Sequence, residues 1–219
     1  VHADAVGTSG GPLLPFALDK AVTRHVPGLG PIKIARHALE VDSILSLPRL
    51  KAHCQTGITC SVKNLFGCVC GIHKALAHVK HGDNGPGRDD FCRFIAGLTA
   101  LLPPQAALVD ALTCMHVTGP SGGEPYPLGL IAASTSCAAV DTAVYGLLGL
   151  SPERLPLWRA LREMAAPGAF SQDILLRGNP VADFAAAGFV VPERLTPHSF
   201  NPWRLCCSAV KRFLAGLRP

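Results

Sequence analysis

The sequence predicts an α/β protein in which helices cover both faces of a three-layer sheet with mostly parallel or mixed strands. Short apolar runs bounded by Pro or Gly, at 43–47, 106–110 and 128–133, predict buried strands. Longer segments with apolar residues at helical spacing lie between these runs. The 219 residues are 48% hydrophobic, which is enough for one core, so we expect one α/β domain over 1–219.

The first third of the chain combines a poorly predicted lead-in with a short strand and helix. Residues 1–30 are rich in Gly and Pro, and an apolar segment at 13–26 predicts a short helix after Pro12 or Pro15. A short strand or turn at 31–34 then precedes a brief helix around 35–41 and a buried strand over 43–47, which Pro48 ends.

Two helices are predicted in the basic stretch that follows. From Gly57, apolar residues at helical spacing form one face, with Thr56 as the N-cap; they are Ile58, Val62, Leu65 and Phe66. A second helix buries Ile72, Ala75, Leu76 and Val79 and carries Lys74, His78 and His81 on its opposite side.

The remaining segments alternate between helix and strand. We expect a helix over 90–102, a strand that ends near Asp110, a Gly- and Pro-rich loop over 118–129 and a strand over 128–133. Residues 134–136 can cap an apolar helix over 138–150 that contains Asp141. A surface helix over 152–164, a loop with a further strand at 181–191 and a basic amphipathic helix over 203–217 complete the chain.

Positive charge is concentrated in one region. No Asp or Glu occurs between Ser43 and Gly82, whereas five Lys or Arg and four His residues do. Such a field favours an anionic ligand or partner. With two Tyr and two Trp in the chain, the aromatic platforms of a nucleic-acid-binding protein are poorly supplied, so we expect no nucleic-acid partner.

The composition also bounds the location. The apolar runs are too short or interrupted for a membrane span. An odd count of nine cysteines is unlike a secreted disulfide framework and favours a reducing cytoplasm. Because the chain begins at Val1, we expect it to be a fragment of a longer protein.

The basic stretch supplies a candidate anion site. Phosphate or carboxylate is held by amides, hydroxyls and ammonium groups that converge, and this stretch offers Lys51, His53, Thr59, Lys63 and Asn64. Lys51 and Lys63 would hold the anion, His53 would donate or accept a proton near neutral pH, and Asp110 would orient one of them. We expect the loop from Gly119 to Gly123 to complete the site. The alternative is that the lysines are solvated and the histidines are satisfied locally.

Two further groups could carry chemistry. Cys54, Cys60, Cys68 and Cys70 could bind zinc or an iron–sulfur cluster, although their spacing matches neither zinc ribbons nor ferredoxins, and free cysteine is commonly a small buried hydrophobe. Asp110 and Asp141 are flanked by apolar residues and need partners, for which Lys51 or Lys63 is available.

Three ordered segments resemble the family known as domain of unknown function 362, over about residues 31–190. They are LPRLKAHCQTGITCSVKNLFGCVCGIHK, LVDALTCMHVTGPSGGEPYPLG and ASTSCAAVDTAVYGLLGL. The positions that match its motifs are Lys51, His53, Thr59, Lys63, Asn64 and Gly67, then Asp110, Gly119, Pro120 and Gly123, then Ser134 and Asp141. The chain departs from the pattern at Val117, at Cys60 and at Ser136–Cys137, where relatives have Asp-Pro.

The resemblance implies a cofactor and partner. Family members often precede a ferredoxin-like module with two four-iron clusters, and this chain lacks the repeated C-x2-C pattern of that module. An iron–sulfur cluster would therefore come from a missing module or a partner. The resemblance also implies cofactor-binding roles for Ser134 and Asp141.

The leading hypothesis is a domain that binds an anionic small molecule or cofactor, as the substrate domain of an iron–sulfur-linked oxidoreductase. A non-catalytic metal-binding or cluster-binding electron-transfer module and a protein interaction domain are the alternatives.

Overall fold

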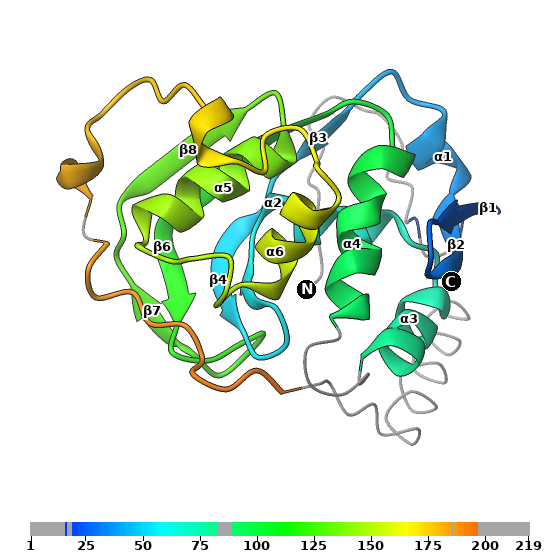
Figure 1. Cartoon of the computed structure of the whole chain (residues 1–219), viewed down its shortest axis with the longest axis horizontal. Coiled ribbons are helices and arrows are strands. Elements are labelled where there is room, and N and C mark those ends of the chain that lie inside the picture. The colour runs from blue at the N-terminus through cyan, green and yellow to red at the C-terminus, as the bar shows by residue number, and fades with distance from the viewer. Residues whose placement is uncertain (1–15, 17–18, 83–88, 185, 197–219) are drawn as a thin grey trace, which may run out of the picture.

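The computed structural model describes residues 16, 19–82, 89–184 and 186–196 (Figure 1). The predicted amphipathic helix over 203–217 lies outside these residues, as does the loop over 83–88. The α/β class is confirmed, and the expectation of one domain over the whole chain stays a prediction.

The longest strand, β6 (Gln105–His116), organises a mixed six-stranded sheet. β3 (Ile44–Ser46) pairs in parallel with the first residues of β6, and β4 (Arg49–His53) pairs in parallel with the residues of β6 that follow. β5 (Gly57–Thr59) pairs antiparallel with β4, while β7 (Glu124–Tyr126) and β8 (Leu130–Ser134) pair antiparallel with β6. The predicted strands at 43–47, 106–110 and 128–133 are thus confirmed, and β6 continues past Asp110.

Residues of β6 alternate between two environments. Ala107, Val109 and Ala111 are buried in the core, whereas Leu108 and Leu112 are 45% and 51% exposed. This period of two separates the inner and outer faces of a strand. By register, Leu45 of β3 and Ile131 of β8 share the outer face with Leu108, and they are also exposed.

Helices pack on the inner face of the sheet (Figure 1). α5 (Cys137–Leu147) contacts β6 and β8, and α2 (Ser61–Asn64), which continues into the short 3-10 helix η2 (Leu65–Cys68), packs between α5 and α4 (Asp90–Leu101). α6 (Pro156–Glu163) packs against α4. The side chain of Ser136 accepts a hydrogen bond from the Ala139 amide at 3.2 Å, so the predicted cap of α5 is confirmed.

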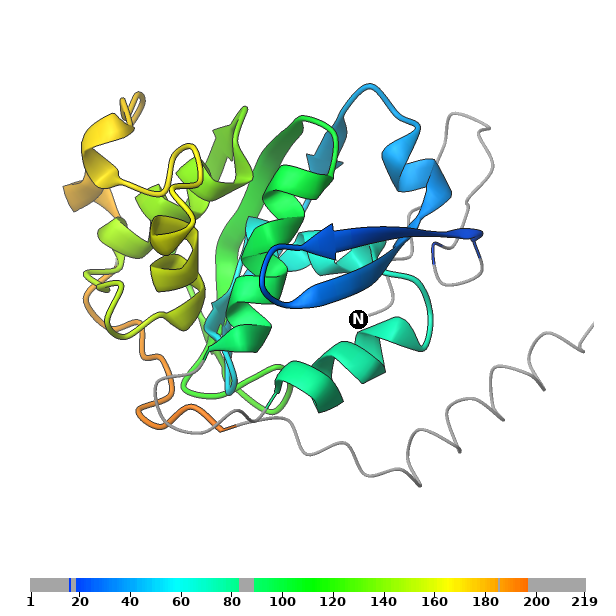
Figure 2. The same cartoon turned by 45° about the vertical axis from the view of Figure 1, so that its right-hand side comes forward.

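The helix predicted within 13–26 is wrong where the structure describes that segment. Ala21–Val26 forms β1, which pairs antiparallel with β2 (Gly30–Ala35) in a two-stranded sheet that lies against α4 (Figure 2). A Cβ at Gly97 of α4 would come within 2.6 Å of Val26 Cγ1, so Gly97 allows the hairpin to approach. The brief helix expected after β2 is α1 (Arg36–Leu39).

The second basic-stretch helix, α3 (His73–His81), forms as predicted, but its orientation is the reverse of the prediction. Ile72 and Val79 are 70% and 66% exposed. The imidazoles of His78 and His81 instead stack on Phe91 and Phe94 of α4, with ring centroids 4.2 and 4.9 Å apart. Aromatic contacts of this kind are favourable beyond the area that they bury, and they place the histidine side of α3 against α4.

The first basic-stretch helix is shorter than predicted, because Gly57–Thr59 is strand β5 and α2 begins at Ser61. Thr56 does not cap it, since its hydroxyl donates to the Ile58 carbonyl at 2.8 Å. The carboxylate of Asp141, on α5, accepts hydrogen bonds from the Ser61 and Val62 amides at 2.8 and 3.0 Å. A side chain 80 positions away thus provides the acceptors that the first turn of α2 needs.

Two shorter helical turns follow α6, namely η3 (Ser171–Asp173) and η4 (Val181–Asp183). The strand expected within 181–191 does not form. The Val117 amide donates to the Val190 carbonyl at 2.9 Å, which places this segment beside the end of β6. Within the described part of the chain, every helix is too short or too polar to cross a membrane.

We predict that Asp141→Asn lowers the free energy of unfolding by about 2–3 kcal/mol, since it puts an amide where two backbone N–H groups and the Tyr145 hydroxyl donate. Urea denaturation measures this. Asp173→Asn, at an exposed acid, is the matched control and should change stability by less than about 0.5 kcal/mol. Equal effects of the two substitutions would contradict the capping role.

Candidate functional site

The candidate site is centred on the ammonium group of Lys63, on α2. Lys63 Nζ lies 6.0 and 5.7 Å from the ring centroids of Phe66 and Phe91. Burial lowers the pKa of Lys63 to about 8, and the charge of Lys51 acts in the same direction. No carboxylate lies within 4.0 Å of this amine among the residues that the structure describes.

Lys51 and Thr59 lie opposite each other on β4 and β5. Burial also lowers the pKa of Lys51, which is half-buried. The hydroxyl oxygen of Thr59 is buried and has no hydrogen-bond partner within the described residues. The two strands therefore place an unpartnered hydroxyl beside a second ammonium, whose charge acts on Lys63.

Gln55 connects the end of β4 to α3. Its backbone amide donates to His53 Nδ1 at 3.0 Å, and its Oε1 lies 3.2 Å from His78 Nδ1. Its Nε2 is buried without a partner in the described chain. Because Nδ1 of His53 accepts, the neutral ring carries its proton on Nε2. His78 in turn stacks on Phe91, and the ammonium of Lys63 lies over the same ring. Phe91 thus links His78 to Lys63.

The Gly-rich loop approaches the end of β4, as the sequence predicts. The Cys54 amide donates to the Gly119 carbonyl at 2.9 Å, and a Cβ at Gly119 would overlap the Ala52 carbonyl. Gly123 is equally restricted, since a Cβ there would overlap the Thr118 carbonyl. Gly119 thus allows the loop backbone to pack against the strand that carries Lys51 and His53, and Gly123 allows it to fold back on the end of β6.

Other predicted site residues are placed elsewhere. Asp110 lies on the outer face, where Arg49 Nε donates to its Oδ2 at 2.9 Å. Ser134 accepts from the Ser136 amide at 3.1 Å at the far end of β8, and Asn64 Nδ2 donates to the Ser46 hydroxyl at 3.1 Å. Asp141 is fully buried against α2.

The expectation that Lys51 or Lys63 pairs with Asp110 or Asp141 is therefore wrong. Asp110 pairs with Arg49, and Asp141 accepts from amides of α2 and from the Tyr145 hydroxyl at 3.2 Å. Burial raises the pKa of Asp141, while the amide hydrogen bonds act in the opposite direction.

The four cysteines proposed as metal ligands do not form a metal site within the described part of the chain, where no three His, Cys, Asp or Glu side chains converge on a point. Burial raises the pKa of Cys68 to about 11 and that of Cys60 well above its usual value. Cys60, Cys68 and Cys70 are core residues of the described structure.

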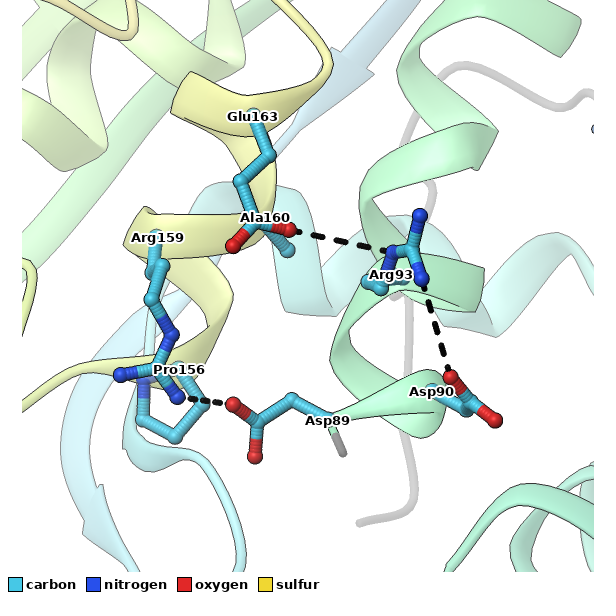
Figure 3. Close-up of a pocket in the computed structure, with 7 residues that line it drawn as sticks. All are labelled: Asp89, Asp90, Arg93, Pro156, Arg159, Ala160 and Glu163. Atoms are coloured by element: carbon cyan, nitrogen blue, oxygen red, sulfur yellow. Dashed lines mark hydrogen bonds and ion pairs between the residues drawn. The ribbon is translucent and has the colours of Figure 1, made fainter. Parts of the chain in front are cut away.

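A surface cavity of about 270 Å³ lies between α4 and α6 (Figure 3). Its charged residues pair with one another: Arg159 with Asp89, and Arg93 with both Asp90 and Glu163 at 3.9 Å. Because these charged groups pair with one another across the cavity, we interpret them as ion pairs that hold α4 and α6 together. The charge alternation in 152–164 was the sequence signal for it.

Sequence reasoning missed Gln55, His78 and Phe91 as site residues. Phe66 was assigned to the apolar face of a helix, and Phe91 lies beyond the basic stretch. The signal that could have found Phe91 is its position at the start of a predicted helix directly after the loop that follows His81.

Comparisons with known proteins extend these observations. The family described as "Domain of unknown function (DUF362)" matches residues 3–146. The chain is 28% identical over 182 residues to a protein of Synechocystis sp. named "Thylakoid-associated protein sll1697", covering 83% of this chain and 56% of that protein. No solved structure matches.

The chain thus spans little more than half the length of this relative. The family match covers the whole basic stretch, the Gly-rich loop and most of α5, which are the segments that build the site. The chain belongs to the DUF362 family.

Proposed function

We propose that this chain binds a small anionic molecule, bearing a carboxylate or phosphate, between Lys51 and Lys63. The observation that carries the proposal is the ammonium of Lys63, which lies over two aromatic rings that attract a cation only weakly and has no carboxylate at 4.0 Å or less in the described residues. Taking a charge out of water without a partner is unfavourable. An anion from solution removes this penalty and relieves the repulsion from Lys51.

Two polar groups of the basic stretch support an anion rather than a cation. Thr59 Oγ1 and Gln55 Nε2 are buried and unpartnered within the described chain, and both can donate hydrogen bonds. Buried donors without acceptors are uncommon in folded proteins. Two ammonium groups, a hydroxyl and an amide thus offer donors, and the two acids that the sequence offered as partners, Asp110 and Asp141, accept from other residues.

His53 is the proposed proton donor or acceptor of the site. Its Nδ1 accepts from the Gln55 amide, which orients the ring and leaves Nε2 as the proton-carrying nitrogen of the neutral form. The proposed place of this domain is the substrate-binding part of a larger redox protein. The resemblance to ferredoxin-linked relatives and the 56% coverage of the Synechocystis protein support this proposal. A cytoplasmic location stays a prediction, and association with a thylakoid-like membrane is the alternative that the relative's name suggests.

We predict that Lys51→Met and Lys63→Met each weaken binding of pyruvate or inorganic phosphate at least tenfold, which is about 1.4 kcal/mol. Isothermal titration calorimetry at pH 7 measures the dissociation constant. Lys80→Met, at an exposed lysine of α3, is the matched control and should bind as wild type does. If the three variants bind both anions with the wild-type constant, the site is misplaced.

We also predict a pH-dependent stability effect of Lys63. Between pH 8 and 10.5 the unfolded chain holds the Lys63 proton and the folded chain does not, so wild-type stability rises relative to Lys63→Met across this window. The change should approach about 3 kcal/mol, the equivalent of a pKa lowered from 10.5 to about 8. Urea midpoints of the two proteins, compared from pH 7 to 10.5, measure it, and a constant difference would contradict the burial of a charged Lys63.

A further inference from the structure

Lys63 has the surroundings of a nucleophilic amine. Its Nζ lies over the faces of Phe66 and Phe91, and a second ammonium, that of Lys51, is close enough for their charges to interact. An amine in an apolar environment beside another cation favours the neutral form, which is the form that attacks carbonyl carbon. The pKa of about 8 agrees with this geometry.

The position of Lys63 is fixed from both ends of α2. Asp141 holds the amides of Ser61 and Val62, and Asn64 donates to the Ser46 hydroxyl at 3.1 Å. A nucleophile on a segment held in this way is presented to a ligand in a fixed orientation, which favours the attack.

We propose that Lys63 forms a Schiff base with an anionic carbonyl compound, such as a 2-oxo acid or a phosphorylated ketone, whose anionic group is held by Lys51. This inference rests on the proposed anion site and names the class of its ligand. A ligand with a carbonyl group and an anionic group matches one nucleophilic and one cationic lysine.

The reaction balances without an oxidant or a metal. The lone pair of the neutral Lys63 amine attacks the carbonyl carbon, and the carbonyl oxygen gains a proton to give a carbinolamine. Loss of the hydroxyl group with the remaining amine hydrogen releases one water and leaves the C=N bond. His53, whose neutral ring accepts at one nitrogen and donates at the other, is the candidate proton carrier for these steps.

Three other lysines, Lys20, Lys33 and Lys80, lack this combination. Lys20 and Lys80 are exposed, and Lys33 Nζ donates to the Thr23 hydroxyl at 2.7 Å. Lys51 is the nearest competitor, because burial also lowers its pKa. Separate substitutions of the two lysines distinguish the nucleophile from the anion holder.

Reductive trapping tests the proposal on the full chain. The protein is incubated with pyruvate or with dihydroxyacetone phosphate in the presence of cyanoborohydride, and labelled lysines are located by peptide mass spectrometry. Pyruvate tests the carboxylate form of the ligand and dihydroxyacetone phosphate the phosphate form. We expect label at Lys63 at least tenfold above that at Lys20, rising with pH around 8.

The variants separate this inference from anion binding itself. Lys63→Arg keeps the positive charge, so it should still bind the anion by calorimetry while losing the label. Lys51→Met should reduce labelling at least tenfold, and Lys20→Arg should leave labelling of Lys63 unchanged. If wild type binds either probe but Lys63 is labelled no more than Lys20, the Schiff base is excluded and the anion site stands. If neither probe binds and no label forms, both proposals fail.

Discussion

The buried carboxylate of Asp141 is the contact on which the site depends. α2 has four residues, far fewer than an isolated helix needs to be stable in water. Its first two amides donate to Asp141, and the Tyr145 hydroxyl donates to the same carboxylate. A carboxyl group with zero exposure is tolerated because three donors surround it. Since Asp141 belongs to α5, the packing of α5 on the sheet sets where α2 lies and which way Lys63 points.

This arrangement separates the charges of the protein into compensated and uncompensated groups. Asp110 pairs with Arg49 on the outer face, and the acids at the start of α4 pair with arginines in the cavity beside α6. Lys63 is left among aromatic rings with no described acidic partner. Burial lowers the pKa of this amine from its ordinary value of 10.5 to about 8, and no described carboxylate lies close enough to offset that effect.

The sequence predicted the elements better than their contacts. The acid-free stretch contains Lys51 and His53 of β4 and Lys63 of α2, and apolar periodicity located β6, β8, α4 and α5. Periodicity could not orient α3, because it separates the two faces of a helix without showing which one packs against the core. In the structure the histidine face packs inward, where His78 stacks on Phe91. Local spacing could not identify the partner of Asp141 either, since the amides that it binds lie 80 positions away.

The burial of Lys63 also connects stability with binding. Holding an ammonium in an apolar environment makes the folded state less stable than it would be with a neutral side chain at the same position. That penalty persists only while the site lacks an anion and the amine also keeps its proton. An anionic ligand and deprotonation therefore stabilise the fold through the same residue, and a ligand that carries both an anionic group and a carbonyl uses both routes at once. A solvated surface lysine such as Lys80 has neither effect, because water already compensates its charge.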